Sequence, residues 1–269
     1  MTNKKDKVTN QLNFNFLTNN VRGMLSTKKR VKMFEYLKSK IGPKGILFLQ
    51  ETHSSTDSEK QWKEEFKGQL YFSHGKTNSC GVLIAFFGNL NVVVKNQFKD
   101  DHGRILILEV TIDDTEYLLV NIYNANTEQE QLKILHNLFV LLEKFDSFCC
   151  KNVIVAGDLN FFFNKKLECK GRNSCLKKQS ITQMIKIQEA FDLCDIWRIR
   201  NPKTIAFTFR QNHFSGIIQR RLDYIFISNS LQETISKVSI LNAFSTDHSP
   251  VFCSFIKKLK YSKAPGFWK

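Results

Sequence analysis

Apolar, β-prone runs and amphipathic segments follow one another along this chain. Apolar residues at three-to-four spacing predict long helices over residues 28–41 and 127–145, with a shorter helix over 58–66 and an interrupted helix over 180–197. Strands are expected over residues 12–18, 45–49, 81–86, 91–98, 104–112, 116–122, 152–156, 206–210, 222–228, 237–241 and 250–256. Because strands often follow one another directly, the pattern predicts an α/β fold of two largely antiparallel sheets with helices outside.

The chain is long enough for one large domain but offers no obvious internal boundary. It has 269 residues, 42% of them hydrophobic and 24 of them Phe, which is ample material for a core. The expected organisation is a flexible leader over residues 1–11 and one domain over residues 12–258. The acidic pair Asp113-Asp114 lies between two expected strands, where a hairpin turn explains it better than a metal site.

The charge of the chain is strongly positive. Forty Lys and Arg against 25 Asp and Glu give a formal net charge of +15. Such a balance fits a nucleic acid or another polyanion as a partner, although a solvated basic surface would give the same number. Residues 165–178 are polar and basic and predict a surface loop, which either follows a phosphate backbone or is merely solvated.

The cysteines and the apolar runs exclude several classes of protein. Seven cysteines without a repeated C-x-x-C spacing suggest neither a zinc site nor a disulfide framework, and they fit a reducing, intracellular compartment. No apolar run reaches membrane-spanning length, so no membrane partner is expected.

Four polar clusters lie at the ends of expected apolar strands, and their residues are the main candidates for a functional site. They are Gln50-Glu51-Thr52, Gly157-Asp158-Leu159-Asn160, Arg221-Leu222-Asp223-Tyr224 and Thr246-Asp247-His248-Ser249. A buried strand carries apolar residues for packing, so acids and a histidine at strand ends need another explanation. If these ends lie side by side, the chain has one cleft whose side chains suit a hard metal ion and a phosphodiester.

The residue types in this cleft suggest which side chains would bind a metal ion, activate a water and hold a phosphate oxygen. Mg²⁺ needs only one or two protein carboxylates, and Glu51 at a strand end fits that need. Asp158 and Asn160 lie on the same side of an extended chain, where the carboxylate can deprotonate a water and the amide can hold an oxygen. An ordinary turn is the alternative explanation for each of these two clusters.

Asp223 and His248 form the most promising pair. A histidine beside a phosphate works best as a cation, and a carboxylate partner both raises its pKa and orients its ring. Asp223 is the candidate partner of His248, and Asp247 is placed to hold a metal ion or a phosphate-bound water.

The segment between two of the expected strands is a candidate DNA contact. Residues 210–221 contain Arg210, Arg220 and Arg221 together with Phe214 and Ile217. A basic hairpin with apolar tips can lie in a groove of DNA and sense its shape, although a plain connecting hairpin remains the alternative.

The chain resembles the endonuclease/exonuclease/phosphatase superfamily, which includes deoxyribonuclease I and the apurinic/apyrimidinic (AP) endonucleases. Seven motifs in family order carry the resemblance: Asn20-Val21-Arg22-Gly23, Gln50-Glu51-Thr52, Asn121-Ile122-Tyr123, Gly157-Asp158-Leu159-Asn160, Phe207-Thr208-Phe209, Arg221-Leu222-Asp223-Tyr224 and Thr246-Asp247-His248-Ser249. Within the superfamily, His53, Asn126 and the ending Ala264-Pro265-Gly266-Phe267-Trp268-Lys269 are similar to the AP-like endonuclease domain of a non-LTR (LINE-type) retrotransposon.

The resemblance implies a four-layered α/β sandwich and Mg²⁺-dependent nicking of one DNA strand, with Mn²⁺ as a possible substitute. It assigns catalytic roles to Asn20, Glu51, Tyr123, Asp158, Asn160, Asp223, Asp247 and His248, and the metal to Glu51 and Asp247. Tyr123 would contact the phosphate and Asp158 would activate the water. Arg22, Thr208, Arg210, Arg220 and Arg221 are the expected DNA-binding residues, and Thr208 would also support the catalytic network.

Two positions depart from the pattern of the AP endonucleases. Many of them carry an acid where this chain has Arg22, which puts a second metal ligand there in doubt. Familiar abasic-site enzymes carry Trp, as part of the wall around the missing base, where this chain has Arg220.

The function expected from these features is that of a retrotransposon endonuclease. It would nick double-stranded DNA in the nucleus and leave a 3′-hydroxyl as a primer for target-primed reverse transcription. Residues 259–269 would begin a linker to a reverse transcriptase domain, and the isolated domain is expected to be monomeric. The alternatives are an AP repair endonuclease, a phosphatase or phosphodiesterase of the same superfamily, and a catalytically inactive DNA-binding module.

Overall fold

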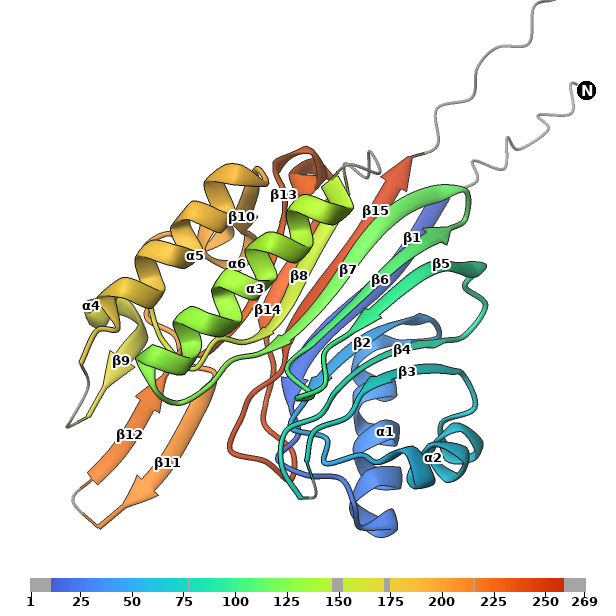
Figure 1. The fold of residues 1–269 in the computed structure, drawn as a ribbon, viewed down its shortest axis with the longest axis horizontal. Helices are drawn as coiled ribbons and strands as arrows, with labels where there is room; N and C mark the ends of the chain where they lie inside the picture. Colours follow the sequence, from blue (N-terminus) through green and yellow to red (C-terminus); the bar gives the residue numbers. More distant parts are fainter. Residues whose placement is uncertain (1–10, 77, 147–151, 172–174, 215, 259–269) are drawn as a thin grey trace, which may run out of the picture.

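Two six-stranded sheets face each other at the centre of the molecule (Figure 1). The computed structural model describes residues 11–76, 78–146, 152–171, 175–214 and 216–258. The first sheet has the order β14 (Ile235–Ile240), β15 (Val251–Lys258), β1 (Gln11–Asn20), β2 (Gly45–Gln50), β4 (Val82–Phe87) and β3 (Gln69–Ser73). The second has the order β10 (Leu193–Asp195), β13 (Asp223–Ser228), β8 (Val153–Asp158), β7 (Thr115–Tyr123), β6 (Ile105–Ile112) and β5 (Val92–Lys99). Each sheet contains one parallel pair, β1 with β2 and β7 with β8, among antiparallel neighbours.

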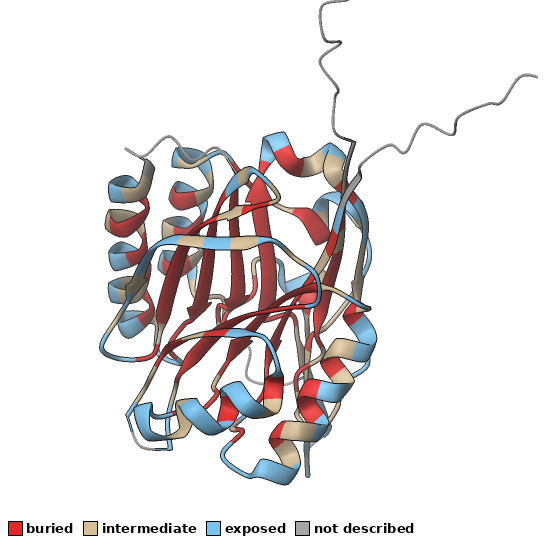
Figure 2. Cartoon of the chain, turned by 90° about the vertical axis from the view of Figure 1, so that its right-hand side faces the viewer, coloured by how far each residue is buried: buried red, intermediate tan, exposed pale blue. Residues whose placement is uncertain are grey.

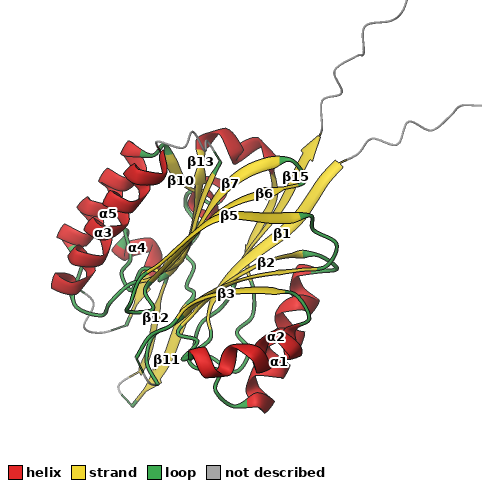
Figure 3. Ribbon diagram, turned by 45° about the vertical axis from the view of Figure 1, so that its right-hand side comes forward, coloured by secondary structure: helices red, strands yellow, loops and turns green. Residues whose placement is uncertain are grey.

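Helices cover the outer face of each sheet (Figure 3). Helices α1 (Thr27–Ile41) and α2 (Glu59–Phe66) pack on the first sheet, and α3 (Glu128–Asp146) and α5 (Lys178–Ala190) pack on the second. The short elements are η1 (Thr56–Ser58), α4 (Lys165–Glu168), α6 (Ile196–Arg200) and η2 (Asn229–Thr234). No helix in the described part of the chain is long and apolar enough to cross a membrane.

Three buried apolar clusters fill the interfaces between these layers. One lies between the two sheets, where Phe14 stacks on Phe255 at a ring distance of 4.6 Å. A second joins α3 and α5 to the second sheet, and a third joins α1 and α2 to the first. The burial pattern agrees with these layers: the central strands are buried, and the helices bury only their inner faces (Figure 2). The predicted four-layered α/β sandwich is therefore confirmed.

Local predictions agree with the structure for most elements, but strand β3 was not predicted, and strand β10 lies inside the helix predicted over residues 180–197. Asp113 and Asp114 form the predicted hairpin turn, with left-handed φ angles of 43° and 63°. Residues 165–178, expected to be a loop, contain α4 and the strand β9 (Cys169–Lys170), because the Glu168 side chain is buried in an ion-pair network. Strand β9 extends the hairpin of β11 (Phe209–His213) and β12 (Gly216–Arg220), which projects from the sandwich (Figure 1). The expected strand over residues 206–210 begins only at Phe209.

The predicted ends of the chain lie largely outside the described residues. Strand β1 begins at Gln11, one residue inside the predicted leader. The rest of that leader and the predicted linker over residues 259–269 are not described, so the proposed domain limits stay predictions.

Gly157 allows two central strands to approach each other closely. Its φ is +152°, and an added Cβ would lie 1.9 Å from the carbonyl oxygen of Ile122 on β7. Any other residue here would push β8 away from β7 and move Asp158, the next residue.

We expect Gly157→Ala to lower the free energy of unfolding by about 3 kcal/mol, since overpacking and an unfavourable φ each cost ~1–3 kcal/mol. Urea unfolding measures the loss. Gly216→Ala is the control, because Gly216 has a φ of +125° but no atom within 4 Å of its added Cβ. Equal losses in the two variants would show that the contact with Ile122 is unimportant.

Candidate active site

The predicted polar clusters meet at one edge of the paired sheets. Glu51 follows β2, Tyr123 ends β7, Asp158 ends β8 and Asp223 begins β13. The strand register pairs Asp158 with Tyr123 on one side and with Asp223 on the other. Because β7, β8 and β13 are neighbours, these side chains lie next to one another at the same edge.

Asp158 is buried at the centre of this group, with 1% of its surface exposed. Its Oδ2 accepts a hydrogen bond of 3.0 Å from Asn20 Nδ2, and its Oδ1 accepts one of 2.8 Å from the Asn160 backbone N–H. Burial and the adjacent charge of Asp223 raise the pKa of Asp158 to about 7. This carboxyl is therefore suited to exchange a proton near neutral pH.

His248 and Asp223 form the predicted pair. The distance from His248 Nδ1 to Asp223 Oδ2 is 2.8 Å, and both residues are buried. Burial lowers the pKa of His248, but the charge and hydrogen bond of Asp223, with smaller contributions from Asp158 and Asp247, outweigh it and raise the pKa to about 9. His248 is therefore a cation at neutral pH.

Thr208 fixes Asp223 from behind. Its Oγ1 accepts hydrogen bonds from the backbone N–H groups of Leu222 and Asp223, at 2.9 and 3.0 Å. The side chain is 1% exposed, so the predicted DNA contact of Thr208 is corrected to a positioning role.

Asn160 occupies a turn whose backbone is left-handed, with a φ of 54°. Its Nδ2 donates to the carbonyl of Asn124 over 2.8 Å, and the Asn124 N–H donates to the carbonyl of Asp158 over 2.8 Å. These bonds hold the amide beside Asp158.

A pair of buried amides without a predicted role joins the two sheets below the site. Gln50 Nε2 donates to Asn121 Oδ1 over 2.7 Å. Asn121 Nδ2 in turn donates to the carbonyls of Leu49 and Leu83, at 3.0 and 2.9 Å. Their signal in the sequence was a polar residue at the end of an apolar run for Gln50 and within an apolar run for Asn121.

Tyr123 lies beside a cation that the sequence analysis missed. The Arg104 guanidinium lies 4.7 Å from the centre of the Tyr123 ring, and its Nη1 donates to the carbonyl of Asn124 over 3.1 Å. Burial, with the charges of Glu51 and Asp158, raises the pKa of Tyr123 well above its usual value. Its phenol is therefore a neutral donor. A lone arginine at the start of a strand carries no distinctive sequence signal.

Glu51 and Asp247 lie around a small group of cations. Asp247 is paired with Arg22, whose side chain is 58% exposed. The Glu51 carboxylate is 26% exposed, and its Oε1 lies 3.8 Å from His53 Nε2. Burial and Arg22 lower the pKa of Lys29, while Glu51 and Asp247 oppose that shift, so all four charges influence one another.

The donor set fits a divalent metal ion. Within the described residues, ligand atoms of Asp158, Asp223 and His248 lie within 4.8 Å of one another. His248 is protonated and bonded to Asp223, so it has no lone pair to offer at neutral pH, and the carboxylates are the better ligands. In the described part of the protein, Oδ1 of Asp223 and of Asp247 is buried without a hydrogen bond, which is consistent with a cation nearby. The Glu51 side chain, which is 26% exposed, offers a further carboxylate that an ion can reach from solvent.

Arg221 does not belong to the DNA-facing surface. Its side chain is 1% exposed, Nη1 lies 2.7 Å from Glu168 Oε1, and Nη2 lies 2.6 Å from Asp195 Oδ2. The guanidinium also lies 4.9 Å from the ring centre of Trp197 and 4.3 Å from that of Tyr224. The predicted DNA contact of Arg221 is therefore corrected: this residue anchors the start of β13.

The other predicted DNA-binding residues lie nearer the surface than Thr208 and Arg221. Arg22 and Arg210 are exposed and Arg220 is partly exposed, and the Arg210 N–H donates to the carbonyl of Asp247 over 2.9 Å. The hairpin of β11 and β12 is thus joined directly to the loop that carries Asp247 and His248.

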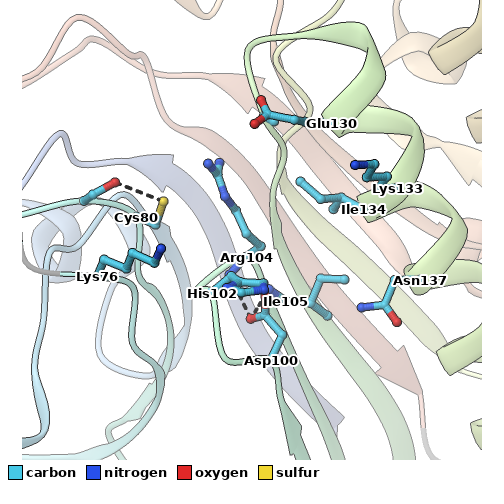
Figure 4. A pocket seen from close by; sticks show the side chains of 12 residues that line it. Lys76, Cys80, Asp100, His102, Arg104, Ile105, Glu130, Lys133, Ile134 and Asn137 are labelled. Carbon is cyan, nitrogen blue, oxygen red and sulfur yellow. Dashed lines mark hydrogen bonds between the residues drawn. The ribbon is translucent and has the colours of Figure 1, made fainter.

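Two hollows flank the centre. The larger, about 570 Å³, lies beside Arg104 and is lined in part by Lys76, His102 and Lys133 (Figure 4). The smaller, about 200 Å³, lies beside Asn160.

Comparisons with known proteins identify the family. The model of the endonuclease/exonuclease/phosphatase family matches residues 14–248. The transposon TX1 uncharacterized 149 kDa protein of Xenopus laevis is 31% identical over 253 residues, which cover 94% of this chain. The chain spans 18% of the length of that curated relative.

Solved structures share the fold at low sequence identity. An AP endonuclease from Leishmania major is 18% identical with a TM-score of 0.74, and the match covers 90% of this chain and 87% of that one. An AP endonuclease from Archaeoglobus fulgidus is 20% identical with a TM-score of 0.70, and the match covers 90% of this chain and 99% of that one. The resemblance predicted from the motifs is confirmed, and the chain belongs to the endonuclease/exonuclease/phosphatase family.

Proposed function

We propose that this chain is the endonuclease domain of a LINE-type retrotransposon, which nicks one strand of duplex DNA and leaves a 3′-hydroxyl for target-primed reverse transcription. The observation that carries the proposal is the buried group of Asp158, Asp223 and His248, which Asn20 and Asn160 flank at the edge of the sandwich. The similarity to a transposon protein supports the retrotransposon as the source. The remainder of the full-length protein, including a reverse transcriptase domain, and action in the nucleus as a monomeric domain belong to the same proposal.

The charges around the site support DNA as the substrate. The net charge of the chain is +15, and Arg22, Arg104 and Arg210 surround the catalytic edge. A polyanion is attracted to such a surface, and its affinity should fall steeply with salt. A phosphatase acting on a small or lipid substrate would not need cations spread over this width.

In the proposed mechanism, Asp158 accepts the proton of the attacking water. The water oxygen forms a bond to phosphorus, the bond to the 3′ oxygen breaks, and that oxygen takes up a proton from solvent water and leaves as a 3′-hydroxyl. Asp158 then releases its proton to solvent. His248 donates a hydrogen bond to a non-bridging oxygen as charge develops, while Asn160 and Tyr123 hold the phosphate. Mg²⁺, or Mn²⁺ in its place, held by Glu51 with Asp247 as the second carboxylate, would supply Lewis-acid stabilisation of that charge.

The catalytic roles predict a large loss of rate with little loss of binding. We expect Asp158→Asn and His248→Ala to lower the nicking rate on supercoiled plasmid by about 10²–10⁴-fold, because each removes a general base or a charge stabiliser. DNA affinity, measured by fluorescence anisotropy, should change little. His136→Ala, an exposed histidine on α3, is the control. Near-normal nicking by either active-site variant would remove that residue from the mechanism.

The metal prediction concerns Glu51. Nicking should stop in EDTA and return with Mg²⁺ or Mn²⁺, and Glu51→Gln should need a much higher metal concentration for half-maximal rate because it lacks the ligand charge. Glu64→Gln, on the exposed side of α2, should behave like the wild type. Undiminished nicking in EDTA would contradict the proposed metal chemistry.

The most direct test against a repair function compares two substrates. AP endonucleases share the fold, so a repair enzyme is the competing proposal. Because Arg220 stands where abasic-site enzymes carry a Trp, we expect matched oligonucleotides with and without an abasic site to be nicked at similar rates. A strong preference for the abasic duplex would favour repair over retrotransposition.

A further inference from the structure

The segment that carries Glu51 has a strained backbone. Glu51 and His53 adopt left-handed φ angles of 56° and 58°, a region that residues other than glycine rarely occupy. Such a conformation persists only where the surrounding groups hold it. The groups that contact this segment therefore decide where the Glu51 carboxylate, the proposed metal ligand, lies.

Two strands that end at the same edge bring a histidine close to this segment. The register places Gln50, at the end of β2, and Ser73, at the end of β3, on either side of Val82. Glu51 and His74 are the residues that follow them. They therefore leave the sheet next to each other, although 22 residues of sequence separate them.

A chain of side-chain hydrogen bonds connects this segment with helix α2. An ionised carboxylate can only accept, so His74 Nε2 donates to Glu59 Oε1, over 2.9 Å. On the other side of the ring, His74 Nδ1 lies 2.9 Å from Ser54 Oγ, and that oxygen lies 3.1 Å from Thr52 Oγ1. Thr52 is the sequence neighbour of Glu51, so the chain ends one residue from the proposed metal ligand.

The members of this chain are also held by their surroundings. Thr52 and Ser54 are buried, and the Thr52 N–H donates to the carbonyl of Gly81 over 3.0 Å. The His74 ring stacks on Phe72 with a centroid distance of 5.3 Å, which fixes the plane of the ring. A hydrogen bond between buried groups is costly to break, because the released groups cannot pair with water. The chain therefore resists movement of Thr52 relative to α2.

We propose that the hydrogen-bonded chain behind Thr52 holds Glu51 in place for the metal ion. The positioning residues of this chain are Glu59, His74 and Ser54. The inference rests on the proposed nicking function and adds to it a physical basis for the affinity of the metal site. Without the chain, the Glu51 backbone relaxes toward ordinary φ angles, and its carboxylate leaves the position in which it can bind the ion.

Mn²⁺ binding to the DNA-free protein tests the proposal without any reaction. The bound ion is measured by the loss of the EPR signal of free Mn²⁺. Ser54→Ala removes the middle of the chain with little change in side-chain volume. We expect its Mn²⁺ dissociation constant to be about ten-fold higher than that of the wild type, which is the lower end of the effect seen when a group that orients a metal ligand is removed.

Two substitutions of Glu59 separate the hydrogen bond from the charge of this side chain. Glu59→Gln and Glu59→Ala both remove the ion pair with Lys63. Only the glutamine keeps an oxygen that can accept from His74 Nε2. We therefore expect nearly wild-type Mn²⁺ affinity in Glu59→Gln, and in Glu59→Ala an affinity as low as that of Ser54→Ala.

Ser228→Ala is the matched control for Ser54→Ala. The Ser228 hydroxyl is also buried, and it accepts a hydrogen bond of 2.8 Å from the Val153 N–H, at the end of β13 opposite to Asp223. Its loss should lower the temperature of thermal unfolding and leave the Mn²⁺ affinity unchanged. In EDTA, every variant should bind a duplex oligonucleotide as the wild type does, because the chain acts on the metal ligand. Circular dichroism confirms that each variant is folded.

The outcomes distinguish this proposal from the proposed function. Wild-type Mn²⁺ affinity in Ser54→Ala, or equal affinities in the two Glu59 variants, would overturn the positioning role even if the wild type nicks DNA. A wild-type protein that binds no Mn²⁺ before DNA is added would overturn it as well, because Glu51 would then not be held ready. If the variants lose Mn²⁺ affinity as expected but the wild type never nicks DNA, the positioning role stands and the proposed function is contradicted.

Discussion

The active edge is organised by two buried carboxylates that cannot both be negative without compensation. The register between β8 and β13 places Asp158 opposite Asp223, and the two residues are 1% and 0% exposed. In a low-dielectric interior, neighbouring like charges raise each other's pKa unless a cation is close. His248 supplies one such cation through its bond to Asp223, and Asn20 and the Asn160 backbone provide donors to Asp158. The other side chains of the edge hold these groups in place.

The sandwich provides that support from several directions. Gly157 lets β8 lie close against β7, and Thr208 clamps the start of β13 from behind. Arg221 anchors the same turn through Glu168 and Asp195. Burying an arginine costs free energy unless its hydrogen bonds are satisfied. Because Arg221 is satisfied only where it meets both carboxylates, these partners fix the position of the start of β13. Loss of either carboxylate would therefore shift the position of Asp223, two residues from Arg221.

A sequence pattern shows which residue types lie at strand ends, but it does not show side-chain directions or distant partners. The accuracy of the predicted site follows this difference. The positions of Asp158, Asn160, Asp223 and His248 at the ends of apolar strands were enough to predict that they lie together, because the ends of neighbouring strands share an edge. The prediction for Arg221 was wrong because the sequence shows its charge but not the direction of its side chain. Its partners, Glu168 and Asp195, lie 53 and 26 residues away in the sequence. Strand β9 was missed for the same reason. Glu168, the residue before it, is buried in ion pairs with Arg198 and Arg221, which lie 30 and 53 residues away in the sequence.

Asp223 keeps His248 protonated at neutral pH, and an NMR titration of the His248 ring measures the pKa that this pairing produces. Because the pKa is raised from 6.5 to about 9, the pairing stabilises the fold fully below pH 6.5 and loses its effect as the pH rises through 9. We expect a wild-type midpoint near pH 9 and a clearly lower midpoint in Asp223→Asn. A wild-type midpoint close to 6.5, unchanged by that substitution, would contradict it.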